Sequence, residues 1–185
     1  MSILKIARMG HPVLRKKARP IETGEIRSAV IQKLIDDMVE TIDEYRGIGL
    51  AAPQVHESLR LFVAGLDDNG ETDEQDEREF TVVAVINPEI KPVGDETAED
   101  WEGCLSIPDI RGRVVRPRRI KVRGLDRRGH RVEFDVRDYP ARMIQHELDH
   151  LDGILFLDRM TRFESLTYTE ELEKFHRRER EASRS

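Results

Sequence analysis

Residues 146–150 read His-Glu-Leu-Asp-His, and this pentapeptide constrains the fold more than any other part of the chain. On a helix, His146 and His150 lie one turn apart on the same face, where two imidazoles can hold a single metal ion. Glu147 lies between them, where its carboxylate can exchange a proton with a water molecule at such an ion. The pattern therefore predicts a helix that is built around a metal site.

The residues on either side predict where this helix begins and ends. Asp138 is a suitable N-cap, Pro140 suits the first turn of a helix, and Gly153 follows the pattern as a stop. We therefore expect the helix to start next to Asp138 and to carry both histidines on its inner face.

Composition limits the classes of protein to consider. The chain has 185 residues, of which 38% are hydrophobic and 37% are charged, and this length predicts one domain over residues 1–185. A net charge of −6 argues against broad, nonspecific binding of nucleic acid, and we expect no specific nucleic-acid partner. No apolar stretch is long enough to cross a membrane and the N-terminus lacks a signal-peptide core, so we expect a cytoplasmic protein.

Hydrophobic periodicity predicts the remaining elements. A stripe of apolar residues predicts an amphipathic helix over 25–45 with Thr23 as its N-cap, and a polar helix is expected from residue 166 onward. Strands are predicted over the ranges 59–66, 80–87, 119–125 and 131–136, with a short fifth strand at 154–157. The acidic segment 67–79 is predicted to be a solvated loop. The expected fold is α+β, with antiparallel strands packed around the metal-binding helix and with N-terminal and C-terminal helices.

A metal ion held by two histidines needs a third protein ligand. Cys104 is the only cysteine, so it forms no disulfide within the chain, and its thiolate is a strong ligand for zinc or ferrous iron. Gly103, in the stretch Glu102-Gly103-Cys104-Leu105-Ser106, lets the backbone bend close to an ion. The downstream alternatives lie in weaker contexts; they are Asp152, Asp158, Glu164 and His176.

The stretch from Gly47 to Gln54 is the third element. Its glycines let another chain approach closely, and backbone groups beside Ile48 are expected to pair with an extended peptide. The side-chain amide of Gln54 is a suitable donor to a developing oxyanion. The alternative interpretation is a glycine turn that leads into a buried Ala-Ala step.

Together these three motifs resemble the peptide deformylase family, whose members remove the N-terminal formyl group from new bacterial and organellar proteins. The family motifs Gly-x-Gly-Leu-Ala-Ala-x-Gln, Glu-Gly-Cys-Leu-Ser and Gln-His-Glu-x-Asp-His stand here at 47–54, 102–106 and 145–150, in the same order. The resemblance extends from about residue 14 to about residue 159. Residues 163–185 form a tail that differs from the long basic helix of some relatives.

The resemblance implies a metal site and an assignment of chemical roles. One divalent ion is expected on Cys104, His146 and His150, with Fe²⁺ as the native metal and Zn²⁺, Ni²⁺ or Co²⁺ as substitutes. Glu147 is expected to act as the proton acceptor. The side chain of Gln54 and the backbone N–H of Leu105 are expected to stabilise the oxyanion.

The expected substrate is the N-formylmethionyl end of a nascent peptide, with transient contact with the ribosome. Its backbone would pair beside Ile48 and Gly49, and its methionine side chain would enter a pocket. The candidate walls of this pocket also include Tyr139, Arg142 and Met143, although Tyr139 and Met143 can also be simple core residues. Arg142 stands where many bacterial members have an apolar residue.

Three other readings remain at the level of sequence. The first is a metallopeptidase of the His-Glu-x-x-His type that cleaves an internal peptide bond. The second is a non-catalytic protein that binds formyl-methionine, which the intact Glu147 and Gln54 argue against. The third is a structural zinc domain, which is disfavoured because three ligands and a general base leave the site open.

Overall fold

Two antiparallel sheets enclose one central helix in a computed structural model, which describes residues 2–66 and 81–182. In the larger sheet the strand order is β1-β2-β3-β6-β7, and in the smaller one it is β4-β5-β8. The strands of the larger sheet are β1 (Gly49–Ala51), β2 (Leu61–Leu66), β3 (Thr81–Pro92), β6 (Arg119–Leu125) and β7 (Arg131–Arg137). Those of the smaller sheet are β4 (Thr97–Cys104), β5 (Ile107–Pro117) and β8 (Thr167–Tyr168). The α+β prediction is confirmed.

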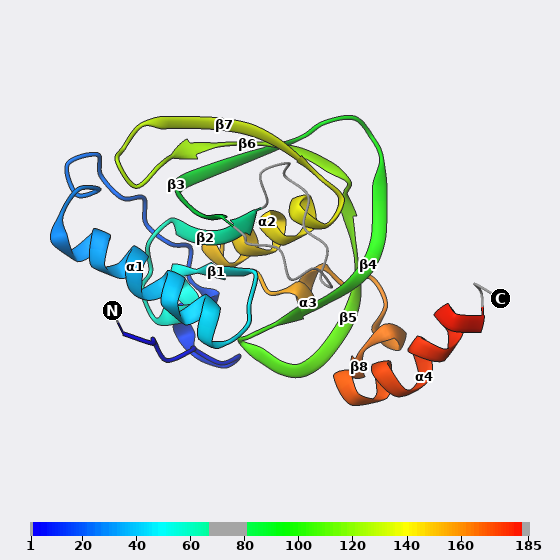
Figure 1. The fold of residues 1–185 in the computed structure, drawn as a ribbon. Helices are drawn as coiled ribbons and strands as arrows, with labels where there is room; N and C mark the ends of the chain where they lie inside the picture. Colours follow the sequence, from blue (N-terminus) through cyan, green and yellow to red (C-terminus); the bar gives the residue numbers. More distant parts are fainter. Residues whose placement is uncertain (1, 67–80, 183–185) are drawn as a thin grey trace.

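Helix α2 (Asp138–Leu151) carries the His-Glu-Leu-Asp-His motif and lies between the sheets (Figure 1). It contacts β1, β2, β6 and β7 of the larger sheet and β5 of the smaller one. Because neighbours surround it, even its polar residues Gln145, Glu147 and Asp149 are buried. A helix in this position can carry polar side chains only where hydrogen bonds or ion pairs compensate their burial.

Both predicted ends of α2 are close to the observed ones. Gly153 follows the helix with a φ of +76°, a conformation that glycine adopts without strain. Asp138 is the first helical residue rather than the N-cap, which is Arg137. The Asp138 carboxylate accepts a 2.7 Å hydrogen bond from Arg118 Nε instead of capping the helix.

The predicted helix over 25–45 is real, but its start was placed too early. Helix α1 runs from Ala29 to Glu44, and its N-cap is Ser28, whose hydroxyl accepts a hydrogen bond from the N–H of Ile31. Thr23 lies in a turn before the helix. The apolar residue Ile26 continues the stripe but is buried outside the helix, so periodicity alone extended the prediction.

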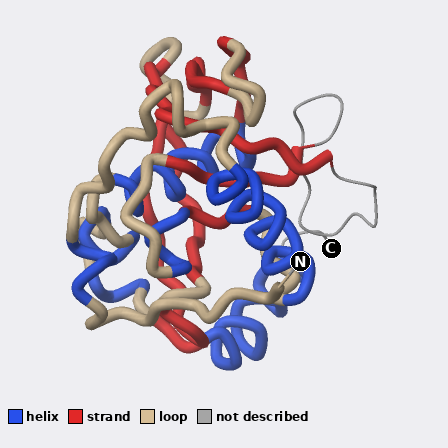
Figure 2. Tube along the Cα trace, turned by 90° about the vertical axis from the view of Figure 1, so that its left-hand side faces the viewer, coloured by secondary structure: helices blue, strands red, loops and turns tan. Residues whose placement is uncertain are grey.

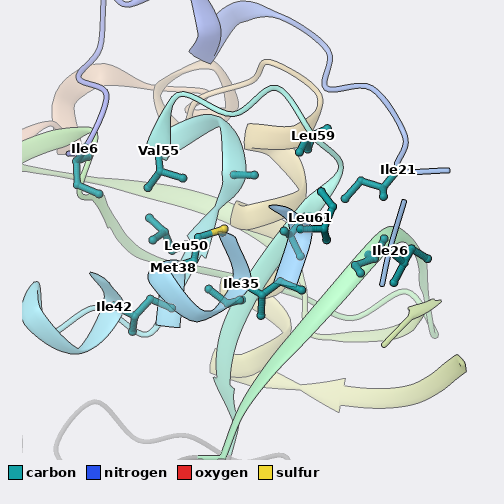
Figure 3. Close-up of a cluster of buried hydrophobic side chains, with 14 residues drawn as sticks. Ile6, Ile21, Ile26, Ile35, Met38, Ile42, Leu50, Val55, Leu59 and Leu61 are labelled. Carbon is teal, nitrogen blue, oxygen red and sulfur yellow. The ribbon is translucent and has the colours of Figure 1, made fainter. Parts of the chain in front are cut away.

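The apolar face of α1 packs against the larger sheet (Figure 3). Ile35, Met38 and Ile42 from the helix share this core with Leu50 of β1 and Leu61 of β2. This packing fixes β1, which immediately precedes the short 3₁₀ helix η2 (Ala52–Val55) that ends the glycine motif.

Four strand predictions are confirmed with small shifts, and one strand is longer than predicted. β3 continues past Asn87-Pro88 to Pro92, although proline normally ends a strand. The register with β6 shifts between Ile86 and Glu89, so Pro88 sits in a bulge and the strand resumes beyond it. The predicted loop at 67–79 lies outside the described residues.

Two long strands were not predicted, and one predicted strand is wrong. β4 and β5 are rich in charged residues and lack clear alternation of apolar and polar residues. Residues 154–157 do not form a strand, because the short helix α3 (Phe156–Arg159) begins there and Asp158 accepts a hydrogen bond from the N–H of Leu155. The polar C-terminal helix is confirmed as α4 (Thr169–Ala182), which follows β8.

The N-terminal segment runs as an extended loop across the body of the molecule (Figure 2). The N–H of Leu4 donates to Thr41 Oγ1 in α1, the N–H of Ala7 to the carbonyl of Gln54, and that of Met9 to the carbonyl of Ser106. The segment therefore joins α1 to the motifs at 47–54 and 102–106. Within the described ranges, no helix is both long and apolar enough to span a membrane.

Candidate metal centre and peptide cleft

Cys104, His146 and His150 converge on one buried point. The cysteine ends β4, whereas the histidines lie one turn apart on α2. One ligand atom from each residue lies within 4.8 Å of the others, and Cys104 Sγ is 3.2 Å from His150 Nε2. Two imidazole nitrogens and one soft thiolate sulfur at this separation suit a transition-metal ion such as zinc or iron. Three protein ligands would leave a further position for water or substrate.

Glu102 determines how His146 presents its ring. Its Oε2 lies 3.0 Å from His146 Nδ1, so the other ring nitrogen, Nε2, is left to face the cysteine and His150. Burial alone would raise the pKa of Glu102, but hydrogen bonds and charges from Arg116 and His146 hold that pKa well below its usual range. The surroundings of Glu102 therefore favour the ionised carboxylate.

Two buried arginines hold Glu102 in place. Arg116 of β5 donates to both of its oxygens, at 2.8 and 2.9 Å, and also donates to Asp149 of α2 at 2.6 Å. Arg142 of α2 donates to Glu102 at 2.8 Å and to the carbonyls of Val114 and Ala98 at 2.8 and 2.7 Å. Because Cys104 and the histidines lie on different elements, these bonds set the distance between β4 and α2.

The donor set fits a metal ion. Burial would raise the pKa of the Cys104 thiol, but the charge of His150 and hydrogen bonds from both histidines lower it well below its usual value. The sulfur is therefore the thiolate that metals bind. His150 directs its Nε2 toward Cys104 Sγ, at 3.2 Å, and its buried Nδ1 has no hydrogen-bond partner among the described residues.

Glu147 lies directly beside the ligands and against Gly49. A Cβ atom built on Gly49 would lie 2.5 Å from Glu147 Oε1, so only glycine leaves room for this carboxylate. Burial raises the pKa of Glu147 to about 7. Its Oε2 has no hydrogen-bond partner within the described part of the chain, and it is therefore free to accept a proton.

Gln54 presents its NH₂ group to the site. Its Oε1 accepts a 2.8 Å hydrogen bond from the N–H of Ala51, which fixes the direction of the amide. Its Nε2 lies 3.4 Å from Cys104 Sγ and 3.4 Å from Ser106 Oγ. A buried amide held in this way is a preorganised donor.

A cleft of about 1030 Å³ is lined by Glu147 and by two of the three metal ligands, Cys104 and His146. Gly49 and Leu105 line it, and so do Ile48, Gln54 and Gly103. Both β1 and β4 are edge strands, so the cleft is bordered by two strand edges that pair with no other described strand.

The free edge of β1 is at Gly49 rather than at Ile48. The carbonyl of Ile48 accepts a 2.8 Å hydrogen bond from the N–H of Gly65 and is therefore occupied. Backbone groups of successive residues in a strand point to opposite sides, so those of Gly49 point toward the cleft.

The predicted pocket residues also line this cleft, but they have other contacts. Met143 is buried in the core beside Val136 and Ile144, and Tyr139 is half-buried at the start of α2. The guanidinium of Arg142 is bound to Glu102 and to strand carbonyls, so only its stem can contact a ligand. Every residue predicted for the site lines this cleft except His150, which is buried beside the other two ligands.

Most of the chain matches the model of a known protein family. Residues 3–165 match the model of the polypeptide deformylase family. The chain belongs to this family. It is 45% identical over 158 residues to peptide deformylase 2 of Nostoc sp., a match that covers 85% of this chain and 86% of that protein.

Solved structures of deformylases agree with the fold. The Met-Ala-Ser-bound class I type b deformylase of Acinetobacter baumannii has a TM-score of 0.78 and 39% identity, covering 86% of this chain and 100% of that one. The Thermotoga maritima deformylase has a TM-score of 0.76 and 40% identity, covering 88% and 100%.

The sequence did not reveal three parts of the site, namely Arg116, the pairing of Arg142 with Glu102, and the β4 edge at Gly103. Arg116 is one of several arginines in the stretch 111–119, which was not recognised as a strand, so nothing in the sequence distinguished it from its neighbours. Ion pairs between distant elements leave no periodic pattern, so they emerge only from the fold.

Proposed function

We propose that the protein hydrolyses the N-terminal formyl group of formyl-methionyl peptides and releases formate and a free amine. The single observation that carries this proposal is the placement of Glu147 beside three metal ligands and against a free strand edge at Gly49. A base, a metal site and a peptide-binding edge therefore meet at one point. Membership of the deformylase family supports the same reaction.

Each polar group has one role in the proposed reaction. Glu147 accepts a proton from the attacking water and returns it to the leaving amine. The amide of Gln54 and the backbone N–H of Leu105 donate to the oxyanion that develops on the formyl oxygen. Formation of a carbon–oxygen bond and cleavage of the carbon–nitrogen bond then give formate and the amine.

Cys104, His146 and His150 would hold one divalent ion, with Fe²⁺ as the native metal and Zn²⁺, Ni²⁺ or Co²⁺ as substitutes. When bound, this ion supplies Lewis-acid activation for the hydrolysis. Glu102 orients His146 for this purpose through its Nδ1.

The peptide would bind as an added strand along Gly49, beside Ile48. Contacts of this kind engage the backbone and tolerate many sequences. The methionine side chain would lie against Tyr139, Met143 and the stem of Arg142. Formyl-methionyl chains arise at ribosomes, so the proposal includes a cytoplasmic location and transient contact with the ribosome.

A comparison of three substrates tests the proposed reaction. Metal-loaded protein is given formyl-Met-Ala-Ser, acetyl-Met-Ala-Ser and an unblocked internal-peptide substrate in parallel reactions. We expect formate from the first and little product from the others, since the acetyl methyl group must fit where the formyl hydrogen lies. Cleavage of the internal peptide bond without formate release would favour a metallopeptidase, and peptide binding without any product would favour a binding protein.

A further inference from the structure

Helix α4 lies beyond the residues that match the model of the deformylase family. The family match ends at residue 165, and α4 begins at Thr169. The strand β8 joins the helix to the smaller sheet by pairing Tyr168 with Ile110 and Thr167 with Arg111 of β5. The start of α4 is therefore held at the sheet that also carries Cys104 (Figure 1).

Two residues in the second turn of α4 line the same cleft as Glu147. Leu172 is half-buried, and Glu173 is exposed. The helix thus brings one apolar and one anionic side chain to the cleft from beyond the end of the family-model match.

We propose that α4 forms an additional wall of the peptide cleft and that it reads a residue after the methionine, with a preference for a cationic side chain opposite Glu173. This inference rests on the proposed function. It concerns which nascent chains are processed fastest and not whether the reaction occurs.

The preference is confined to one position of the peptide. Charges of both signs line the cleft besides Glu173: Lys5, Arg8, Arg46 and Arg111 are cationic, and Asp100 and Asp109 are anionic. An extended peptide advances about 3.3 Å per residue, and its successive side chains point to opposite faces. We therefore expect the side chain at only one position of the peptide to lie opposite Glu173. Glu173 is exposed, and pairs at exposed sites change affinity by about twofold to fivefold.

A scan of substrate charge against matched helix variants tests the charge preference. Lysine or glutamate is placed in turn at each of the four positions after formyl-methionine, and kcat/KM is measured for the full chain. At one position we expect a preference for lysine of about twofold to fivefold that Glu173→Lys reverses and high salt weakens. Glu170→Lys is the control, because Glu170 is an exposed carboxylate on the same helix that does not line the cleft.

The apolar contact has its own control. Leu172→Ser should raise KM for five-residue formylated peptides and leave formyl-Met-Ala unchanged, whereas Phe175→Ser, an exposed position away from the cleft, should affect neither. If Glu173→Lys and Glu170→Lys give the same selectivity, or if Leu172→Ser leaves KM unchanged, α4 is not a wall. Failure to release formate even from formyl-Met-Ala would instead overturn the proposed reaction.

Discussion

At the scale of single residues, Gly49 shows how one backbone position controls the chemistry. Its Cα faces Glu147, and a Cβ atom there would lie 3.0 Å from the Glu147 Cδ and 2.5 Å from its Oε1. The motif therefore needs glycine for space, whereas the sequence suggested only a close approach of the substrate. Both requirements act at the same residue.

Gly49→Ala should lower kcat about 100-fold, because Glu147 must move by about 1 Å to avoid the new methyl group. Bound metal, measured by elemental analysis, should stay at the wild-type level, since the atoms nearest to the new methyl group belong to Glu147 and not to a ligand. Gly47→Ala is the matched control: its Cβ would lie 3.4 Å from Leu105 Cδ1, an ordinary contact. Equal rates for the two variants would contradict the account of Gly49.

Glu102 gives a prediction about pH. Its pKa is lowered by folding despite its burial, because Arg116 and His146 stabilise the charged form. The folded state therefore binds fewer protons than the unfolded state in acid, and stability is lost as pH falls below about 4, the ordinary carboxyl range. Glu102→Gln should flatten this part of the unfolding free energy against pH and lower stability by about 3–5 kcal/mol at pH 7. Denaturant titrations at several pH values measure both effects, and an unchanged acid slope would count against this role.

At the scale of elements, apolar patterning predicted α1, β6 and β7 because each buries one face, and it predicted β2 because all six of its residues are buried. It failed at β4 and β5, whose inward residues include Glu102 and Arg116. Buried charges that neutralise one another look like surface residues in a sequence. The strand that supplies Cys104 was missed for this reason, although its motif was recognised.

The link between β4 and α2 can be tested through Arg142. Arg142→Met keeps the apolar stem but removes the bonds to Glu102 and to the carbonyls of Val114 and Ala98. We expect metal affinity to fall about 10- to 100-fold, as for other residues that orient a ligand. Competition with a chelator measures this affinity. Arg137→Met, at an exposed arginine before α2, is the control, and equal affinities in both variants would show that Arg142 does not position the ligands.

At the scale of the whole molecule, the site was easier to predict than the fold. Three short motifs identified the ligands and Glu147, because their chemistry depends on residue type and local spacing. The arrangement that joins them depends on long-range packing: α2 lies between two sheets, and the N-terminal segment ties α1 to Gln54 and Ser106. Neither feature has a local signal. Likewise, nothing in the sequence indicated that Leu172 and Glu173 of α4 line the cleft.

Formate release from formyl-Met-Ala-Ser by anaerobically prepared, iron-loaded protein tests the central claim most directly, with Glu147→Ala measured alongside it. Glu147 is not a ligand, so both proteins should bind one equivalent of metal. Only the wild type should release formate, because the variant has no group to accept and return the proton. Substantial formate release by the metal-loaded Glu147→Ala protein would contradict the assignment of Glu147 as the base.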